Sequence, residues 1–362
     1  ATGSGCAPGI VGAPAVFIGD LFDRRNFALA YTLPRRNMQV ARVHQLSLSV
    51  EQALADRLVA SVAYVGTFGG NIIRPGTPNG GALTPLYFFQ ATPTSPFDRA
   101  QVLQRRNDSA AGAISGFSTD ADATYHALQI SVRQRYAYGL TFQSAYTWSH
   151  AIDSISDLFD TAGNANRSQI ELDVPNITRL ERGSASFDIR HRFTTGVQYD
   201  LPWMATNPWL GGFQVSGIVT LQTGQPFTVI TGLDTNRDGN RTDRLATTQG
   251  LVFRNQGAQR IALAPGINPL TLTAFNFTEP GEGLVGRNTF RAPGVALVDA
   301  ALTKRFTFAE RYALLLRVEA FNLFNRTHFA TPVRLLEAPA FGRAVATAVP
   351  PRQIQFAVKF QF

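Results

Sequence analysis

One segment of the sequence carries oxygen ligands at the spacing of a calcium-binding loop. In "DTNRDGNRTD", oxygen-bearing side chains stand at alternate positions and a glycine is the sixth residue; the four are Asp234, Asn236, Asp238 and Asn240. A calcium loop uses this layout, with a bidentate acid at its twelfth position. A leucine stands there in this chain, so Asp243 would have to supply that carboxylate. The segment therefore predicts a weak calcium site, and a turn built from Asx and glycine residues is the alternative.

The rest of the sequence shows no enzyme signature. The five histidines lack metal-ligand spacing, and the sequence holds no GxSxG, HExxH or phosphate-binding glycine loop. His150 and Asp153 could be drawn into a catalytic triad, but His150 also follows Trp148 on a predicted strand, where an interfacial role is simpler. The single cysteine, Cys6, excludes an internal disulfide and a zinc site built on several thiolates. We therefore expect no enzyme activity and no cofactor other than calcium.

Charge and composition exclude two further classes of protein. The net charge of +8 comes almost wholly from arginine, and these arginines are scattered rather than clustered, so we expect no nucleic-acid partner. With 44% hydrophobic and 16% charged residues, the chain is too apolar for disorder. No window approaches the roughly 18 uncharged apolar residues of a transmembrane helix.

Apolar and polar residues alternate along the chain with the period of a β-strand. At the C-terminus, "RQIQFAVKFQF" places the even positions from Ile354 to Phe362 on an apolar face and Lys359 with the glutamines on the other. The same alternation predicts nine strands, at about 44–54, 57–66, 125–135, 140–150, 187–201, 213–231, 298–308, 311–324 and 352–362, and a candidate tenth within 15–33.

Strand and connection lengths favour a membrane barrel over a sandwich. The predicted strands are about twice as long as the roughly 5 to 6 residues usual in sandwiches. Tilted by about 40°, eleven residues rise close to the apolar height of about 25 Å in outer-membrane barrels. Short turns alternate with the long connections 67–124, 151–186, 232–297 and 325–351. We therefore predict an all-β, antiparallel transmembrane outer-membrane β-barrel with long extracellular loops and short periplasmic turns.

Several charged residues fall on the polar side of these strands by parity. They are Asp188, Arg190 and Arg192 in one run, and Arg317 and Glu319 in another. Charges that face a barrel interior normally pair with one another, so we expect these residues to form structural ion-pair networks in the lumen.

Five segments resemble the barrel of Oar-like TonB-dependent transporters, in the same order. They are "YHALQISVRQRYAYGLTFQSAYTWSHAID", "FDIRHRFTTGVQYDLP", "GFQVSGIVTLQTGQPFTV", "RVEAFNLFNRTHF" and "PRQIQFAVKFQF", and the resemblance runs from about residue 37 to the end. "NLFN" at 322–325 is similar to the "NLFD" element near the end of such barrels. The resemblance implies a place in the bacterial cell outer membrane, contact with outer-membrane lipid, and the TonB system as a partner. Phe360 and Phe362 resemble the terminal signal by which the barrel assembly machinery recognises its clients.

The resemblance is to a part of such a transporter. Barrels of that family have 22 strands and follow a plug domain, whereas about ten strands and no plug are found in this sequence. We expect an N-terminal loop and candidate first strand in residues 1–36, and in 37–362 the C-terminal half of a 22-stranded barrel. A self-contained ten-stranded barrel is the alternative. The function implied is movement of an unknown substrate across the outer membrane, when joined to a plug and driven by TonB. The alternative is a structural or adhesive barrel whose long loops bind a surface or partner.

Overall fold

The computed structural model describes residues 31–34, 37–76, 114–156, 181–202, 207, 209–232, 244–273, 285–308 and 312–362. No helix in these ranges is long and apolar enough to cross a membrane.

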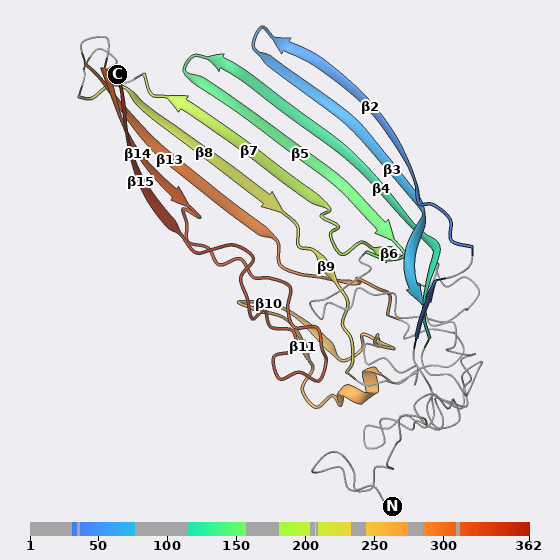
Figure 1. Cartoon of the computed structure of the whole chain (residues 1–362). Coiled ribbons are helices and arrows are strands. Elements are labelled where there is room, and N and C mark those ends of the chain that lie inside the picture. The colour runs from blue at the N-terminus through green and yellow to red at the C-terminus, as the bar shows by residue number, and fades with distance from the viewer. Residues whose placement is uncertain are drawn as a thin grey trace, which may run out of the picture.

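Nine long strands form one antiparallel sheet (Figure 1). In chain order they are β2 (Arg42–Ala55), β3 (Leu58–Gly76), β4 (Ile114–Ala137), β5 (Leu140–Asp153), β7 (His191–Asp200), β8 (Phe213–Gln222), β13 (Val295–Phe308), β14 (Tyr312–Phe321) and β15 (Gln353–Gln361). Each of the nine pairs with the next along the chain. The nine predicted strands are confirmed.

Six short strands and a 3-10 helix complete the described secondary structure. β1 (Tyr31–Pro34) pairs in parallel with β4, and β6 (Gly183–Ser184) pairs with β5. β9 (Pro226–Phe227) pairs with β12 (Phe290–Arg291), and β10 (Leu251–Gln256) with β11 (Gln259–Leu263). The helix η2 covers Pro269–Leu272. The candidate tenth strand lies mostly outside the described residues, and its described part is β1, a parallel partner rather than an antiparallel neighbour.

Several predicted strand boundaries were wrong. β3 continues to Gly76 and β4 begins at Ile114, so strand residues occupy both ends of the connection predicted at 67–124, and β14 ends at Phe321 rather than at 324. The run predicted from 187 begins as a strand only at His191, because the buried Asp188 is held outside the ladder by a hydrogen bond from Ala151 N, 2.8 Å long. The run predicted to 231 stops at Gln222. Gly224 then passes so close to the Ala292 carbonyl that any Cβ would clash with it, and this close approach of two backbones ends the ladder.

Short and long connections lie at opposite ends of the sheet, as predicted. The β2–β3, β4–β5, β7–β8 and β13–β14 connections lie at the upper end in Figure 1, and the long connections lie at the other. We call these the turn end and the loop end. At the turn end, Tyr138 and Gly139 both have positive φ values, of 53° and 79°, the combination that a tight hairpin turn requires.

The register gives the sheet two chemically different faces. The apolar face carries rows such as Val50, Val62, Ile130, Tyr146, Phe193 and Leu221, which lie opposite one another on successive strands. The polar face carries rows such as Thr141, Gln198, Ser216, Ala301, Glu319 and Gln355. Leu48, Phe356 and Val358 on the apolar face are 70%, 78% and 72% exposed. Most of the large exposed apolar residues lie on this face, as in a lipid-facing barrel wall, whereas Val43, Ile218 and Phe321 are exposed on the polar face.

The sheet is open. β2 and β15 end the strand order, and within the described ranges neither has a partner along its outer edge. An open sheet of this kind is consistent with part of a larger barrel.

The long connections pack into a small body of their own at the loop end. We define this loop assembly as residues 223–232, 244–273, 285–294 and 322–352. Its core is a cluster of buried side chains: Phe227, Val229, Leu245, Ile261, Leu272, Val285, Phe290, Ala292, Leu336 and Phe341. The last connection, 322–352, joins this body through paired backbone bonds with Ile230, which donates to Arg334 O and accepts from Leu336 N.

Candidate functional site

The polar face of the sheet carries a hollow of about 390 Å³. Strands β4, β5, β7, β8, β13 and β14 line it, and its polar side chains include Arg133, Gln143, Gln198, Ser216, Asp299, Arg317 and Glu319. Small residues leave the space: a Cβ added at Gly196 would meet nothing within 4 Å. A concave surface of this size with convergent polar groups can hold a small molecule or a polar segment of protein.

One charged pair in the hollow forms as the sequence predicted. Arg317 and Glu319 stand two residues apart on β14, so they share a face, and Arg317 Nη2 lies 2.6 Å from Glu319 Oε1. Arg192 lies on the polar face of β7, opposite Thr147 and Gln222. Asp188 and Arg190 precede the strand and pair with each other at the loop end, with Arg190 Nε 3.5 Å from Asp188 Oδ2.

The NLFN segment is a turn that fastens the last long connection to the sheet. Asn322 has φ of 49°, is buried, and receives a hydrogen bond from Arg326 N at 3.0 Å while its amide donates to Arg326 O at 3.0 Å and Pro350 O at 3.2 Å. Asn325 accepts from Arg352 N at 3.0 Å. The two asparagines therefore bridge the beginning and the end of the connection. The NLFN motif was found in the sequence by its resemblance to a known element, but the sequence did not predict these hydrogen bonds.

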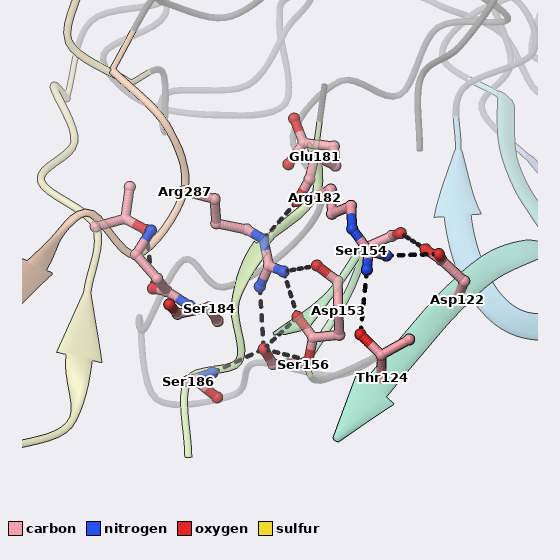
Figure 2. Close-up of polar contacts among 12 residues, drawn as sticks. Asp122, Thr124, Asp153, Ser154, Ser156, Glu181, Arg182, Ser184, Ser186 and Arg287 are labelled. Carbon is pink, nitrogen blue, oxygen red and sulfur yellow. Dashed lines mark hydrogen bonds and ion pairs between the residues drawn. The ribbon is translucent and has the colours of Figure 1, made fainter. Parts of the chain in front are cut away.

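Two arginine–carboxylate contacts, one buried and one partly exposed, join the ends of β4 and β5 to the loop end (Figure 2). Arg287 forms a buried ion pair with Asp153 and also donates to Ser156 Oγ at 3.0 Å and Glu181 O at 2.9 Å. Arg182 donates to Asp122 Oδ2 at 2.7 Å and to Thr124 Oγ1 at 3.1 Å. Residues more than a hundred positions apart are thus held together at the sheet rim.

Two further buried acids extend this network. Glu181 accepts two bonds of 2.9 Å from Arg244 Nη1, and Asp188 accepts a bond of 2.5 Å from Arg291 Nη2. Removing one partner of such a buried pair typically costs about 3 to 5 kcal/mol, because the other charge is left uncompensated. The network therefore fixes the geometry of the loop end.

The network also answers the question of a His150–Asp153 catalytic pair. The Asp153 carboxylate binds Arg287 and Ser156, whereas His150 Nε2 lies 3.0 Å from Arg190 Nη2 and 3.3 Å from Ser184 Oγ. The two side chains serve different contacts, and neither arrangement is that of a nucleophile with its base.

The remaining predicted site residues lie in two places. Asp234, Asn236, Asp238, Asn240 and Asp243 are all outside the described residues, so the calcium site stays a prediction. Phe360 and Phe362 lie at the turn end, where Phe360 stacks against Tyr312 at 5.9 Å between ring centroids and against Phe362 at 6.1 Å.

Comparison with known proteins gives a sequence family and several distant structural neighbours. A family profile described as "Outer membrane beta barrel domain" matches residues 23–355. No curated protein matches the chain.

Three solved structures similar to the chain are much larger than it. The outer membrane transporter YddB from Escherichia coli is 10% identical with a TM-score of 0.48, over 91% of this chain and 34% of that one. The ferric enterobactin receptor PfeA from Pseudomonas aeruginosa is 14% identical with a TM-score of 0.47, over 91% and 32%. The ferripyoverdine receptor of the same organism is 13% identical with a TM-score of 0.43, over 89% and 27%. The chain thus spans about a third or less of the length of these proteins.

Proposed function

Because the chain belongs to the outer membrane beta barrel domain family and has its place in the bacterial outer membrane, we propose that it is part of the barrel of a TonB-dependent transporter. In that role, it lets a substrate cross the outer membrane when the barrel is joined to a plug and the TonB system acts on that plug. The barrel itself is a conduit rather than an enzyme.

The observation that carries the proposal is the polar, hollowed face of a sheet whose other face is apolar. A barrel wall with lipid on one side and a filled core on the other would place packed apolar side chains inside. Here the inner face carries glutamine, serine, threonine and an arginine–glutamate pair around a hollow of about 390 Å³, whose lining also includes the apolar Ile218 and Phe321. Such a face suits water, a solute or the polar surface of a plug.

The open edges support a barrel larger than these nine strands. In lipid, every backbone donor and acceptor needs a partner, so the outer edges of β2 and β15 must pair with further strands. Barrels of about 16 or more strands enclose an aqueous or plugged lumen, whereas about eight strands leave an interior filled by side chains. A polar inner face therefore fits a wide barrel, in which it would line an aqueous or plug-filled lumen.

Genetics in the native organism tests the proposal. Deleting the gene should alter the depletion of one or more solutes from a defined medium, measured by mass spectrometry of the medium. Deleting the TonB gene should produce the same change, and the double deletion should add nothing to it. A solute phenotype that persists unchanged in cells without TonB would contradict the proposal.

The ordered loop assembly favours a second candidate function, adhesion. Its ten-residue core and its buried arginine–carboxylate contacts give the loop end a fixed surface that could bind another surface or partner. An adhesive barrel predicts that gene deletion lowers attachment of cells to a surface equally in the presence and absence of TonB. Attachment assays on the same four strains therefore separate the two functions.

A further inference from the structure

Four of the five histidines lie on the apolar face, in three neighbouring rows of the ladder near the loop end. His126 and His150 are directly opposite each other on β4 and β5, and His191 is opposite Trp148. His44 lies opposite Phe68, whose ring contacts the ring of His126 edge-on at 5.3 Å. Histidine is polar, whereas a lipid-facing wall is built from apolar residues. The presence of four histidines on this face of β2, β4, β5 and β7 therefore requires an explanation.

Two of these histidines are oriented by the same contact. The Tyr64 hydroxyl lies 2.8 Å from Nδ1 of His126, and the Tyr146 hydroxyl lies 2.8 Å from Nδ1 of His191, with each pair of rings stacked at 6.2 Å. When the tyrosine donates, Nδ1 is the acceptor and Nε2 carries the hydrogen. His126 and His191 are both exposed, so each then offers an N–H donor to the surroundings of the barrel.

Two arginines add permanent positive charge to the same part of the apolar face. Arg42 stands two residues from His44 on the same face of β2, is exposed, and pairs with no acid among the described residues. Arg190 donates to His150 Nε2 at 3.0 Å. Asp122 binds Arg182, and the single carboxylate of Asp188 lies 2.5 Å from Arg291 Nη2 and 3.5 Å from Arg190 Nε, so two guanidinium groups share one acid there. This part of the apolar face therefore carries a net positive charge.

The opposite border of the apolar face has different chemistry. At the turn end it carries aromatic residues without histidine: Trp209, Phe213, Phe306, Phe308, Tyr312, Phe360 and Phe362. Its one lysine, Lys304, is buried between the rings of Phe213 and Phe306 and donates to Gly211 O. From Leu140 to Trp148 on β5, eight residues at about 3.4 Å and a tilt of about 40° rise about 21 Å, close to the apolar height of a membrane barrel. The two borders thus match the two faces of a bilayer. The loop-end border carries four histidines and two arginines, whereas the one lysine of the turn-end border is enclosed by aromatic rings.

We propose that this histidine band, defined as His44, His126, His150 and His191 with Arg42 and Arg190, binds the phosphate groups of lipid head groups in the leaflet at the loop end. Phosphate oxygens accept hydrogen bonds from imidazole N–H groups and bidentate bonds from guanidinium groups. The acyl chains of the same lipid would lie along the exposed apolar residues below the band. His150 acts by positioning Arg190. The band binds lipid whether or not the barrel transports a solute.

Lipid retention by the full-length outer-membrane protein tests this proposal. The protein is purified in a neutral detergent and incubated with lipid A carrying two phosphates or with the same lipid after dephosphorylation, and retained lipid is counted by native mass spectrometry. We expect strong preference for the phosphorylated lipid. Each arginine or lysine near an anionic surface contributes about 1 kcal/mol, which is about fivefold in affinity. The variant Arg42→Gln/His126→Gln/His191→Gln should therefore retain the phosphorylated lipid at least about fivefold less.

A matched control removes positive charge from the polar face of β4 and β7, two of the strands that carry the histidine band. Arg133→Gln/Arg192→Gln takes two cations from β4 and β7 but from the polar face, and should retain phosphorylated lipid as the unaltered protein does. Equal loss in both variants would overturn the proposal, because charge would then act without regard to face. Equal retention of the two lipids by the unaltered protein would also overturn it. This comparison uses no variant, so a folding defect cannot explain its result. Neither arm depends on transport, so a failed solute experiment leaves this one interpretable.

Discussion

Replacing Asn322 by alanine should release the last long connection from the sheet. The side chain is buried and makes three hydrogen bonds, one from Arg326 N and two to the carbonyls of Arg326 and Pro350. These bonds tie the first residues of the 322–352 connection to its last ones. Alanine removes all three and leaves backbone groups at both ends without their partners.

The magnitude follows from the number of bonds and from the backbone. Each hydrogen bond contributes about 0.5 to 1.5 kcal/mol net, so three contribute about 2 to 4 kcal/mol. The φ of 49° at Asn322 is a left-handed conformation, which costs alanine about 1 kcal/mol more than glycine. We expect Asn322→Ala to destabilise the docked connection by about 3 to 5 kcal/mol, and Asn322→Gly by about 1 kcal/mol less.

Limited trypsin digestion of the full-length protein in detergent measures this release. The connection offers cleavage sites at Arg326, Arg334 and Arg343, and cleavage follows the population of the open form when opening and closing are fast. A loss of about 3 kcal/mol raises that population, and the initial cleavage rate, about 100-fold. Phe324→Ala is the matched control, because Phe324 lies in the same turn but is 73% exposed. It should change the rate by about twofold at most.

The reasoning would be refuted if Asn322→Ala were cut no faster than Phe324→Ala. Equal rates for Asn322→Ala and Asn322→Gly would refute only the backbone part of the estimate and leave the hydrogen bonds as the cause.

Four other outcomes are expected. With the native cysteine replaced by serine, a cysteine at Asp238 should react with an impermeant maleimide on intact cells and one at Pro202 should not; the reverse would invert the topology. One residue inserted after Val358 moves the following lysine to the apolar face, costing up to about 2 to 4 kcal/mol at mid-membrane and less near the rim, so heat-modifiable gel mobility should show less folded barrel. Deleting Phe362 should lower outer-membrane levels in membrane fractions, whereas Phe362→Trp should not; unchanged levels would leave it an interfacial anchor. Burial, and secondarily Arg326, lowers the pKa of His328, so the unfolded loop assembly binds more protons and stability falls as pH drops below about 6.5. Hydrogen exchange of residues 326–348 should therefore show less protection at pH 5 than at pH 7.5, after correction for intrinsic rates, and a His328→Gln variant should lose that difference.

The sequence by itself determined the strands, their two faces and the ends at which they turn. Alternation is a local property, because successive side chains of an extended chain point to opposite sides whatever the rest of the protein does. For this reason, Val358 and Lys359 could be assigned to opposite faces, and Arg317 and Glu319 to one face, before any partner strand was known. The lengths of the connections were less well determined, because β3 and β4 extend into the connection predicted at 67–124.

Tertiary structure alone decided what depends on contacts between distant residues. Asp188 fits the strand alternation, yet it leaves the ladder because Ala151 N and Arg291 bind it. Gly224 ends β8 because the backbone at Ala292 passes beside it. The gathering of four histidines in three neighbouring rows of one face depends on the register between strands, and a shift of one residue would move a histidine to the other face. The alternation of apolar and polar residues shows which face each side chain occupies but not which residues it contacts. Those contacts define both the loop assembly and the histidine band.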